Sequence, residues 1–124
     1  MTKANAVAHC RQAEEYLRAA EHSLDAGDFN AAAGTAIDAG INAADAVAGM
    51  NLGRRWKGPH EQAAQFVAGA GIDGRDVAKE LRRLLPLKTQ SHYSSQSVTR
   101  SKATGCVEAA RRAVAVARRA TRRA

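Results

Sequence analysis

Apolar side chains recur along this chain at intervals of three and four residues, which is the spacing of one helix face. The first such segment covers about residues 4–26, and the second covers about 28–49. Gly27 between them is suited to end the first helix, and Asp28 is suited to cap the second. The second segment has small residues on most sides, so we expect it at the centre of a helical bundle.

Three further helices are expected towards the C-terminus, at about residues 59–70, 75–93 and 99–121. Glycines mark a loop at 49–59 and a turn at 69–74 between these segments. The polar stretch before the last helix ends at a threonine, Thr99, whose hydroxyl can cap that helix. All connections are therefore short.

Pro86 lies inside the fourth segment. Because proline has no N–H to donate to the Arg82 carbonyl, we expect the helix to kink or restart there. About five helices with short connections predict an all-α fold, an antiparallel helical bundle in which residues 1–124 form a single domain.

Composition agrees with helices and narrows the chemistry. Aromatic residues make up only 4% of the chain, and the two cysteines, Cys10 and Cys106, match no CxxC or zinc-site spacing. We expect both thiols to be reduced and the protein to need no metal or cofactor. The sequence has no signal-peptide pattern and no apolar run near 20 residues, so a soluble, cytoplasmic protein without membrane contact is expected.

The net charge of +7 is concentrated at one end of the chain. Before residue 100, 11 Lys and Arg balance 11 Asp and Glu, whereas from residue 100 onwards eight cations face the single acid Glu108. The basic end, about 111–124, carries two neighbouring rows of arginines on its helix: Arg111, Arg118 and Arg122, and Arg112, Arg119 and Arg123. These rows predict an anionic partner bound in a salt-dependent way, and the alternative is a solvated helix face.

Motifs of the common enzyme classes are missing from the sequence: it has no P-loop, GxGxxG, HExxH or GxSxG. One cluster of reactive side chains remains at the end of the fourth helix, formed by Lys88, His92 and Tyr93. Lys88 and His92 are four positions apart, so both project from one side of a helix. A histidine beside a cation can cleave RNA without metal, as general base on a 2′-hydroxyl. The alternative is an ordinary solvated pair.

The loop before the third helix offers a second candidate site. It places a stackable aromatic side chain among three cations, in the run Arg54, Arg55, Trp56 and Lys57. This combination suits a nucleotide or a single-stranded nucleic acid, although a lone tryptophan can also be a lid on the core. His60 can cap its helix, pack or contact a ligand, while His9 and His22 are expected to be surface positions without function.

The order of these segments resembles the HEPN superfamily over nearly the whole chain. The matching features are the opening helix around residues 13–20, the Gly27-Asp28 turn, the alanine-rich stretch 43–47, Gly53-Arg54 through His60, Leu84-Leu85 with Lys88 and Tyr93, and Val98-Thr99 opening the last helix. The resemblance implies a five-helix bundle that commonly dimerises and occurs in prokaryotic toxin–antitoxin, defence and nucleotidyltransferase-associated proteins.

Catalytic members of that superfamily carry an Arg, then four to six residues, then His, and they cleave RNA without metal. This sequence departs from that pattern, because Arg82 and Arg83 lie ten and nine positions before His92. Lys88 lies closer but lacks the two-pronged geometry of arginine for a phosphate. Members without the motif look like binding modules for a nucleotidyltransferase, toxin or antitoxin partner.

The leading hypothesis is a non-catalytic HEPN-like module that dimerises and binds a protein partner, RNA or both, in a toxin–antitoxin or defence system. The first alternative is a metal-free ribonuclease toxin that uses His92 and Lys88. The second alternative is a nucleic-acid-binding protein without sequence preference, which contacts phosphates through its arginine-rich last helix.

Overall fold

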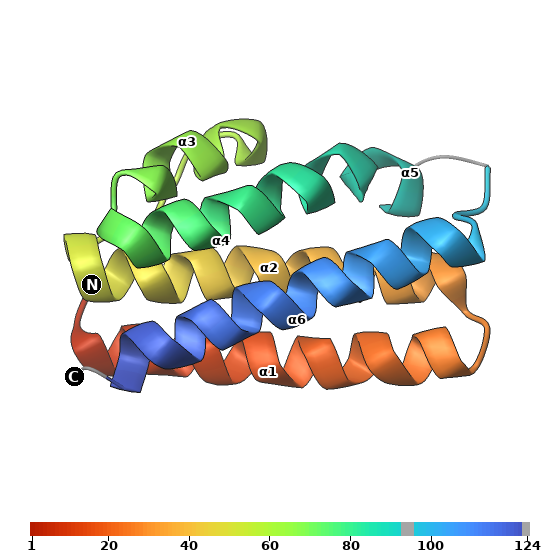
Figure 1. Cartoon of the computed structure of the whole chain (residues 1–124), viewed down its shortest axis with the longest axis horizontal. Coiled ribbons are helices and arrows are strands. Elements are labelled where there is room, and N and C mark those ends of the chain that lie inside the picture. Colours follow the sequence, from red (N-terminus) through yellow and green to blue (C-terminus); the bar gives the residue numbers. More distant parts are fainter. Residues whose placement is uncertain (93–95, 123–124) are drawn as a thin grey trace.

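The computed structural model describes residues 1–92 and 96–122, and all regular structure in these two ranges is helical. Figure 1 shows three long helices, α1 (Lys3–Asp25), α2 (Phe29–Leu52) and α6 (Arg100–Arg122), lying along one axis. A second group, α3 (Ala63–Ala68), α4 (Gly71–Leu84) and α5 (Lys88–His92), lies along the other side of α2. The predicted all-α bundle is confirmed.

Helix α2 is the centre of the bundle, as its small side chains predicted, because it packs against α1, α3, α4, α5 and α6. Thirteen of its residues are buried, and most of them are alanine or glycine. A methyl group added at Gly40 would collide with the Leu84 side chain of α4. Small residues therefore let neighbouring helices approach α2 on several sides at once.

The ends of the long helices follow local chemistry. The Thr2 hydroxyl accepts a 3.1 Å hydrogen bond from the Asn5 N–H at the start of α1. Gly27 adopts a left-handed conformation, with φ of 80°, in the turn to α2. At the start of α6, the Thr99 hydroxyl accepts from the Lys102 N–H at 3.2 Å, so the predicted cap is confirmed. At α2, the Asp28 backbone oxygen rather than its side chain accepts, from the Ala32 N–H at 2.9 Å.

Two boundaries predicted from glycines are wrong. Helix α2 continues past Gly49 to Leu52, and Gly53, with φ of 71°, ends it. Helix α4 begins at Gly71 rather than near residue 75, so Gly74 is helical. Any side chain at Gly74 would collide with the Val67 carbonyl oxygen of α3. Gly74 is thus a close-packing position between two helices and not a turn residue.

The predicted interruption at Pro86 is confirmed. Helix α4 ends at Leu84, a short 3-10 turn η2 (Leu85–Leu87) contains the proline, and α5 restarts at Lys88. Another 3-10 turn, η1 (His60–Gln62), leads into α3 and faces η2. This pairing of two irregular turns brings His60 beside the start of α5.

Both cysteines are buried free thiols, as predicted. Burial raises the pKa of the Cys106 thiol to about 11, so that thiol stays protonated at neutral pH. In the described parts of the chain, none of the helices combines the length and apolar character that a bilayer-spanning segment needs.

Candidate functional site

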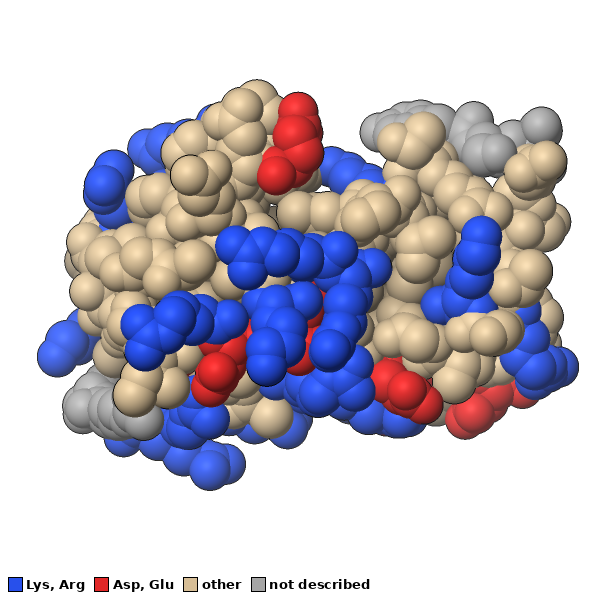
Figure 2. Space-filling model, turned by 45° about the horizontal axis from the view of Figure 1, so that its top comes forward, with Lys and Arg blue, Asp and Glu red and all other residues tan. Residues whose placement is uncertain are grey.

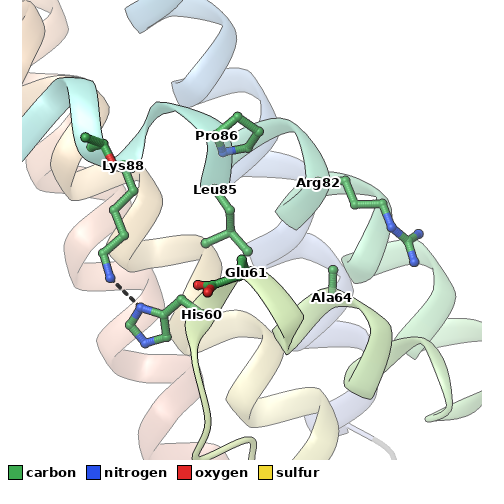
Figure 3. Close-up of a pocket in the computed structure, with 8 residues that line it drawn as sticks. His60, Glu61, Ala64, Arg82, Leu85, Pro86 and Lys88 are labelled. Carbon is green, nitrogen blue, oxygen red and sulfur yellow. Dashed lines mark hydrogen bonds between the residues drawn. The ribbon is translucent and has the colours of Figure 1, made fainter.

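A pocket of about 480 Å³ opens where η1 meets the end of α4 and the start of α5 (Figure 3). We call it the lysine pocket. Its apolar floor comes from Ala64, Leu85 and Pro86, and its polar side chains come from two segments that are far apart in sequence. The lining comprises His60, Glu61, Ala64, Arg82, Leu85, Pro86, Lys88 and Thr89.

The lysine pocket is organised around a contact between Lys88 and His60. The Lys88 ammonium donates a hydrogen bond to Nδ1 of the His60 ring (Figure 3). An ammonium has hydrogens and no lone pair, so Nδ1 must accept. In a neutral ring the hydrogen then sits on Nε2, which leaves His60 a donor at its other end.

The remaining charged groups of the lysine pocket lie on either side of this pair. Arg82 lies at the opposite end, with its guanidinium turned away from His60, whereas Glu61 follows His60 on η1 (Figure 3). Lys88, Arg82 and the His60 Nε2–H supply donors, and Glu61 is the single carboxylate in the lining. A donor-rich rim over an apolar floor suits an anionic group attached to a less polar body, such as a nucleotide.

The structure joins only part of the predicted Lys88, His92 and Tyr93 cluster. Lys88 lines the pocket, and His92 ends α5 four positions later, but its side chain lies outside the described part of the structure. Tyr93 also lies outside the described residues. The partner found for Lys88 is His60, 28 positions earlier in the chain. Spacing along one helix could not have found it, because the contact depends on how η1 packs against η2.

A second cavity, of about 300 Å³, lies between α1, α2, the loop before η1, and α3. We call it the aspartate pocket. Asp45 of α2 is half-buried in it, and the nearest cation is Arg55, with a guanidinium nitrogen 3.9 Å from the carboxylate. Burial raises the pKa of Asp45, and the opposing charges of His9 and Arg55 only partly offset this.

His9 also faces the aspartate pocket, so the prediction that it is a surface position is wrong. It is half-buried, and its Nδ1 is 3.1 Å from Oδ1 of Asn42 on α2. The Asn42 amide nitrogen donates in turn to the Asp38 carbonyl at 3.0 Å. Its Oδ1 must therefore accept, which makes His9 Nδ1 the donor. One feature of the sequence indicated this burial. His9 lies four positions before Ala13, a buried residue of α1, so the two side chains lie on the same side of the helix.

Trp56 is both a lid and a pocket wall. Its indole Nε1 donates to the Pro59 carbonyl at 2.7 Å, and its ring centroid lies 5.3 Å from that of Phe66. The Arg54 guanidinium stacks 5.0 Å from the Phe66 ring centroid. The half-buried Trp56 ring packs against the core and also borders the aspartate pocket. Lys57 is exposed and lines a shallow hollow with Arg54 and Arg55.

Protein-family models provide a comparison for the whole chain. The model for the HEPN domain matches residues 6–120. This chain belongs to the HEPN family. A search of curated proteins found no match to it.

In this HEPN domain, four of the six arginines in the predicted rows are paired with acids. On the α1 side, Arg111 pairs with Glu21 and Arg118 with Glu14, at 3.0 and 2.9 Å. On the α4 side, Arg112 pairs with Glu80 at 3.0 Å. Arg119 pairs with both Asp73 and Asp76, each at 2.7 Å. Half of the eight cations counted from residue 100 onwards are thus paired with acids from other helices.

Two arginines of the rows remain, Arg122 and Arg123. Arg122 is exposed and borders a shallow hollow between α1 and α6, whereas Arg123 lies outside the described residues. Figure 2 shows that Lys and Arg side chains gather in the middle of one face, with acids among them. Helix α4 also carries exposed cations, of which Arg83 pairs with Glu80 at 2.8 Å: Arg75, Lys79, Arg82 and Arg83.

Among the side chains that the structure describes, no three of His, Cys, Asp or Glu group as metal ligands. The lysine pocket and the aspartate pocket both include His60 in their lining, so the two cavities adjoin.

Proposed function

We propose that this HEPN domain is a non-catalytic module that binds single-stranded RNA, with a phosphate seated in the lysine pocket. The observation that carries the proposal is the hydrogen bond from Lys88 to His60. It holds an ammonium next to a ring that carries an N–H, and Arg82 adds a second cation at the opposite end of the pocket. Phosphate oxygens accept from such donors, and charged donors give the strongest bonds.

The same hydrogen bond argues for binding over cleavage. A general base needs a lone pair that faces the 2′-hydroxyl. In His60 one ring nitrogen accepts from Lys88 and the other carries the hydrogen, so the neutral ring has no lone pair to offer. His60 can hold a phosphate in place, but it must leave Lys88 before it can accept a proton at Nδ1.

We also expect the module to dimerise and to act with a cognate toxin, antitoxin or nucleotidyltransferase partner, in a toxin–antitoxin or defence system. The large exposed apolar side chains at one end of the bundle, Leu52 and Ile72, are available for such a contact. The Asn51 side chain donates to the Ala70 carbonyl at 2.9 Å, which holds the end of α2 near the start of α4.

The test is RNA binding by the full chain, measured by fluorescence anisotropy with a labelled uridine hexamer. Lys88→Ala should weaken binding about tenfold, because one charged phosphate contact is lost. The matched control is Lys102→Ala, which removes an exposed lysine of α6 that lines neither pocket, and it should bind like wild type. Equal affinity in all three proteins would overturn the proposal.

A metal-free ribonuclease that uses His92 and Lys88 is the second candidate, because Lys88 opens α5 and His92 ends it. The protein is incubated with total cellular RNA without metal, beside His92→Ala and His60→Ala variants. We expect intact RNA in every sample. Cleavage that disappears in His92→Ala would establish the ribonuclease instead.

A further inference from the structure

Asp45 is a charged group that the packing of the bundle does not explain. It lies half-buried on α2, the most buried helix of the protein, and its closest cation is 3.9 Å away, beyond hydrogen-bond distance. Its side chain lines the aspartate pocket. Among the described residues that line this cavity, Asp45 is the only acid.

The walls of the aspartate pocket suit a flat ring. Trp56 and Phe66 provide two aromatic side chains, and small or aliphatic residues such as Ile41 and Ala48 form the apolar surface beside them. At about 300 Å³ the cavity is at the small end of ligand pockets, so it fits one heterocycle rather than a chain. Stacking of a base on an aromatic side chain stabilises binding by roughly 1–3 kcal/mol.

The charges around Asp45 exclude a simple cation as the occupant. Arg55 already brings one positive charge to the carboxylate, and His9 also favours its ionised form. A cationic ligand would be repelled by Arg55, whereas a neutral ring that donates hydrogen bonds would not. The occupant should therefore be an uncharged heterocycle with adjacent N–H donors.

We infer that the aspartate pocket recognises a guanine base of the bound RNA. Guanine presents two neighbouring donors, N1–H and the 2-amino group, which match the two oxygens of the Asp45 carboxylate. Its O6 lies next to N1 and can accept from Arg55, which stands beside Asp45. Adenine offers only its 6-amino group on that edge, and uracil only N3–H, so each forms one such bond at most.

The position of the pocket links the base to the phosphate site. His60 lines both cavities, so a nucleotide can place its base at Asp45 while a phosphate lies near Lys88. The inference rests on the proposed RNA binding for its biological meaning. The base pocket can nevertheless be tested by itself, because a nucleoside carries no phosphate.

The experiment uses the full chain and uridine hexamers that carry one central guanine, adenine or hypoxanthine. We expect the guanine hexamer to bind at least tenfold more tightly than the adenine hexamer. Hypoxanthine, which lacks the 2-amino group, should fall between them. In Asp45→Asn the guanine preference should disappear while the plain uridine hexamer still binds, because the amide oxygen can accept from a single N–H and the Lys88 contacts remain.

Two matched variants separate recognition from folding. Asp25→Asn removes the same charge from an exposed position at the end of α1, and it should keep the full guanine preference. Arg55→Met changes a half-exposed loop side chain, and it should reduce the preference by removing the contact to O6. If Asp45→Asn is misfolded by circular dichroism, the Arg55→Met result decides.

A nucleoside titration distinguishes the failure of this inference from the failure of RNA binding. Trp56 is the only tryptophan of the chain, so its fluorescence reports on this pocket. Guanosine should quench it at concentrations where adenosine does not. RNA binding without a guanine preference would overturn the base pocket and leave the proposed function standing. Guanosine quenching that Asp45→Asn abolishes, without RNA binding, would support the base pocket and overturn the proposed function.

Discussion

Asp45 destabilises the fold at the position where we propose that it binds guanine. Its carboxylate is partly withdrawn from water, and desolvation outweighs the attraction of His9 and Arg55, so the pKa of Asp45 is raised. A raised carboxyl pKa means that the folded protein disfavours the ionised form relative to the unfolded chain. At neutral pH, Asp45 therefore lowers the free energy of unfolding.

We predict that Asp45→Asn raises the melting temperature at pH 7, because the amide keeps the shape of the side chain and removes the charge. Circular dichroism melts measure this, with Asp25→Asn as the control that should melt like wild type. The penalty is absent well below pH 3.8, the ordinary pKa, because the carboxyl is then protonated in both states. It develops as pH rises from 3.8 to the raised pKa and is constant above it. The gain should thus shrink on acidification. A lower melting temperature at pH 7 would mean that the Arg55 ion pair dominates.

At the scale of elements, α6 is held to both of its neighbours by ion pairs of unequal burial. The Arg111 pair with Glu21 is exposed on both sides. The Arg119 pair reaches Asp73, whose side chain is fully buried at the start of α4, and also the more exposed Asp76. Both carboxylates raise the pKa of Arg119 above its ordinary value. The two arginines thus look equivalent in the sequence but not in the structure.

We predict that Arg119→Ala lowers the free energy of unfolding by about 1–2 kcal/mol, because it removes charged hydrogen bonds to a buried carboxylate. Arg111→Ala should cost less than about 1 kcal/mol, since exposed ion pairs are weak and screened by solvent. Urea unfolding of the two variants beside wild type provides the comparison. Equal losses would show that burial of Asp73 adds nothing to the pair.

The helices could be predicted from the sequence because apolar spacing and proline act locally. Pro86 interrupts the helix wherever α4 packs, since it lacks an N–H. Gly74 could not be interpreted in that way, because its role depends on the Val67 carbonyl of another helix. The same holds for the candidate site. Lys88 could be singled out from its position in the sequence, whereas its contact with His60 could not, because tertiary packing brings the two residues together.

At the scale of the whole molecule, folding rearranges the charge that the sequence places at one end. Acids from α1 and α4 pair with four arginines of α6, and Lys and Arg side chains gather on one face of the molecule (Figure 2). Arg75, Lys79 and Arg82 follow one another at spacings of four and three, which puts them on one face of α4. Arg82 lies at the rim of the lysine pocket, so this row leads to the proposed phosphate site.

We predict that RNA binding depends on salt mainly through the α4 row. Each phosphate contact contributes a slope of about −0.7 to the logarithm of affinity against the logarithm of salt for a single strand. Lys79→Ala should reduce the slope by about that amount in titrations between roughly 50 and 200 mM salt. Arg111→Ala should leave the slope unchanged, because Glu21 already pairs with that charge. A larger effect at Arg111 than at Lys79 would contradict this prediction. It would indicate that α6 makes the phosphate contacts and would favour nucleic-acid binding through the last helix.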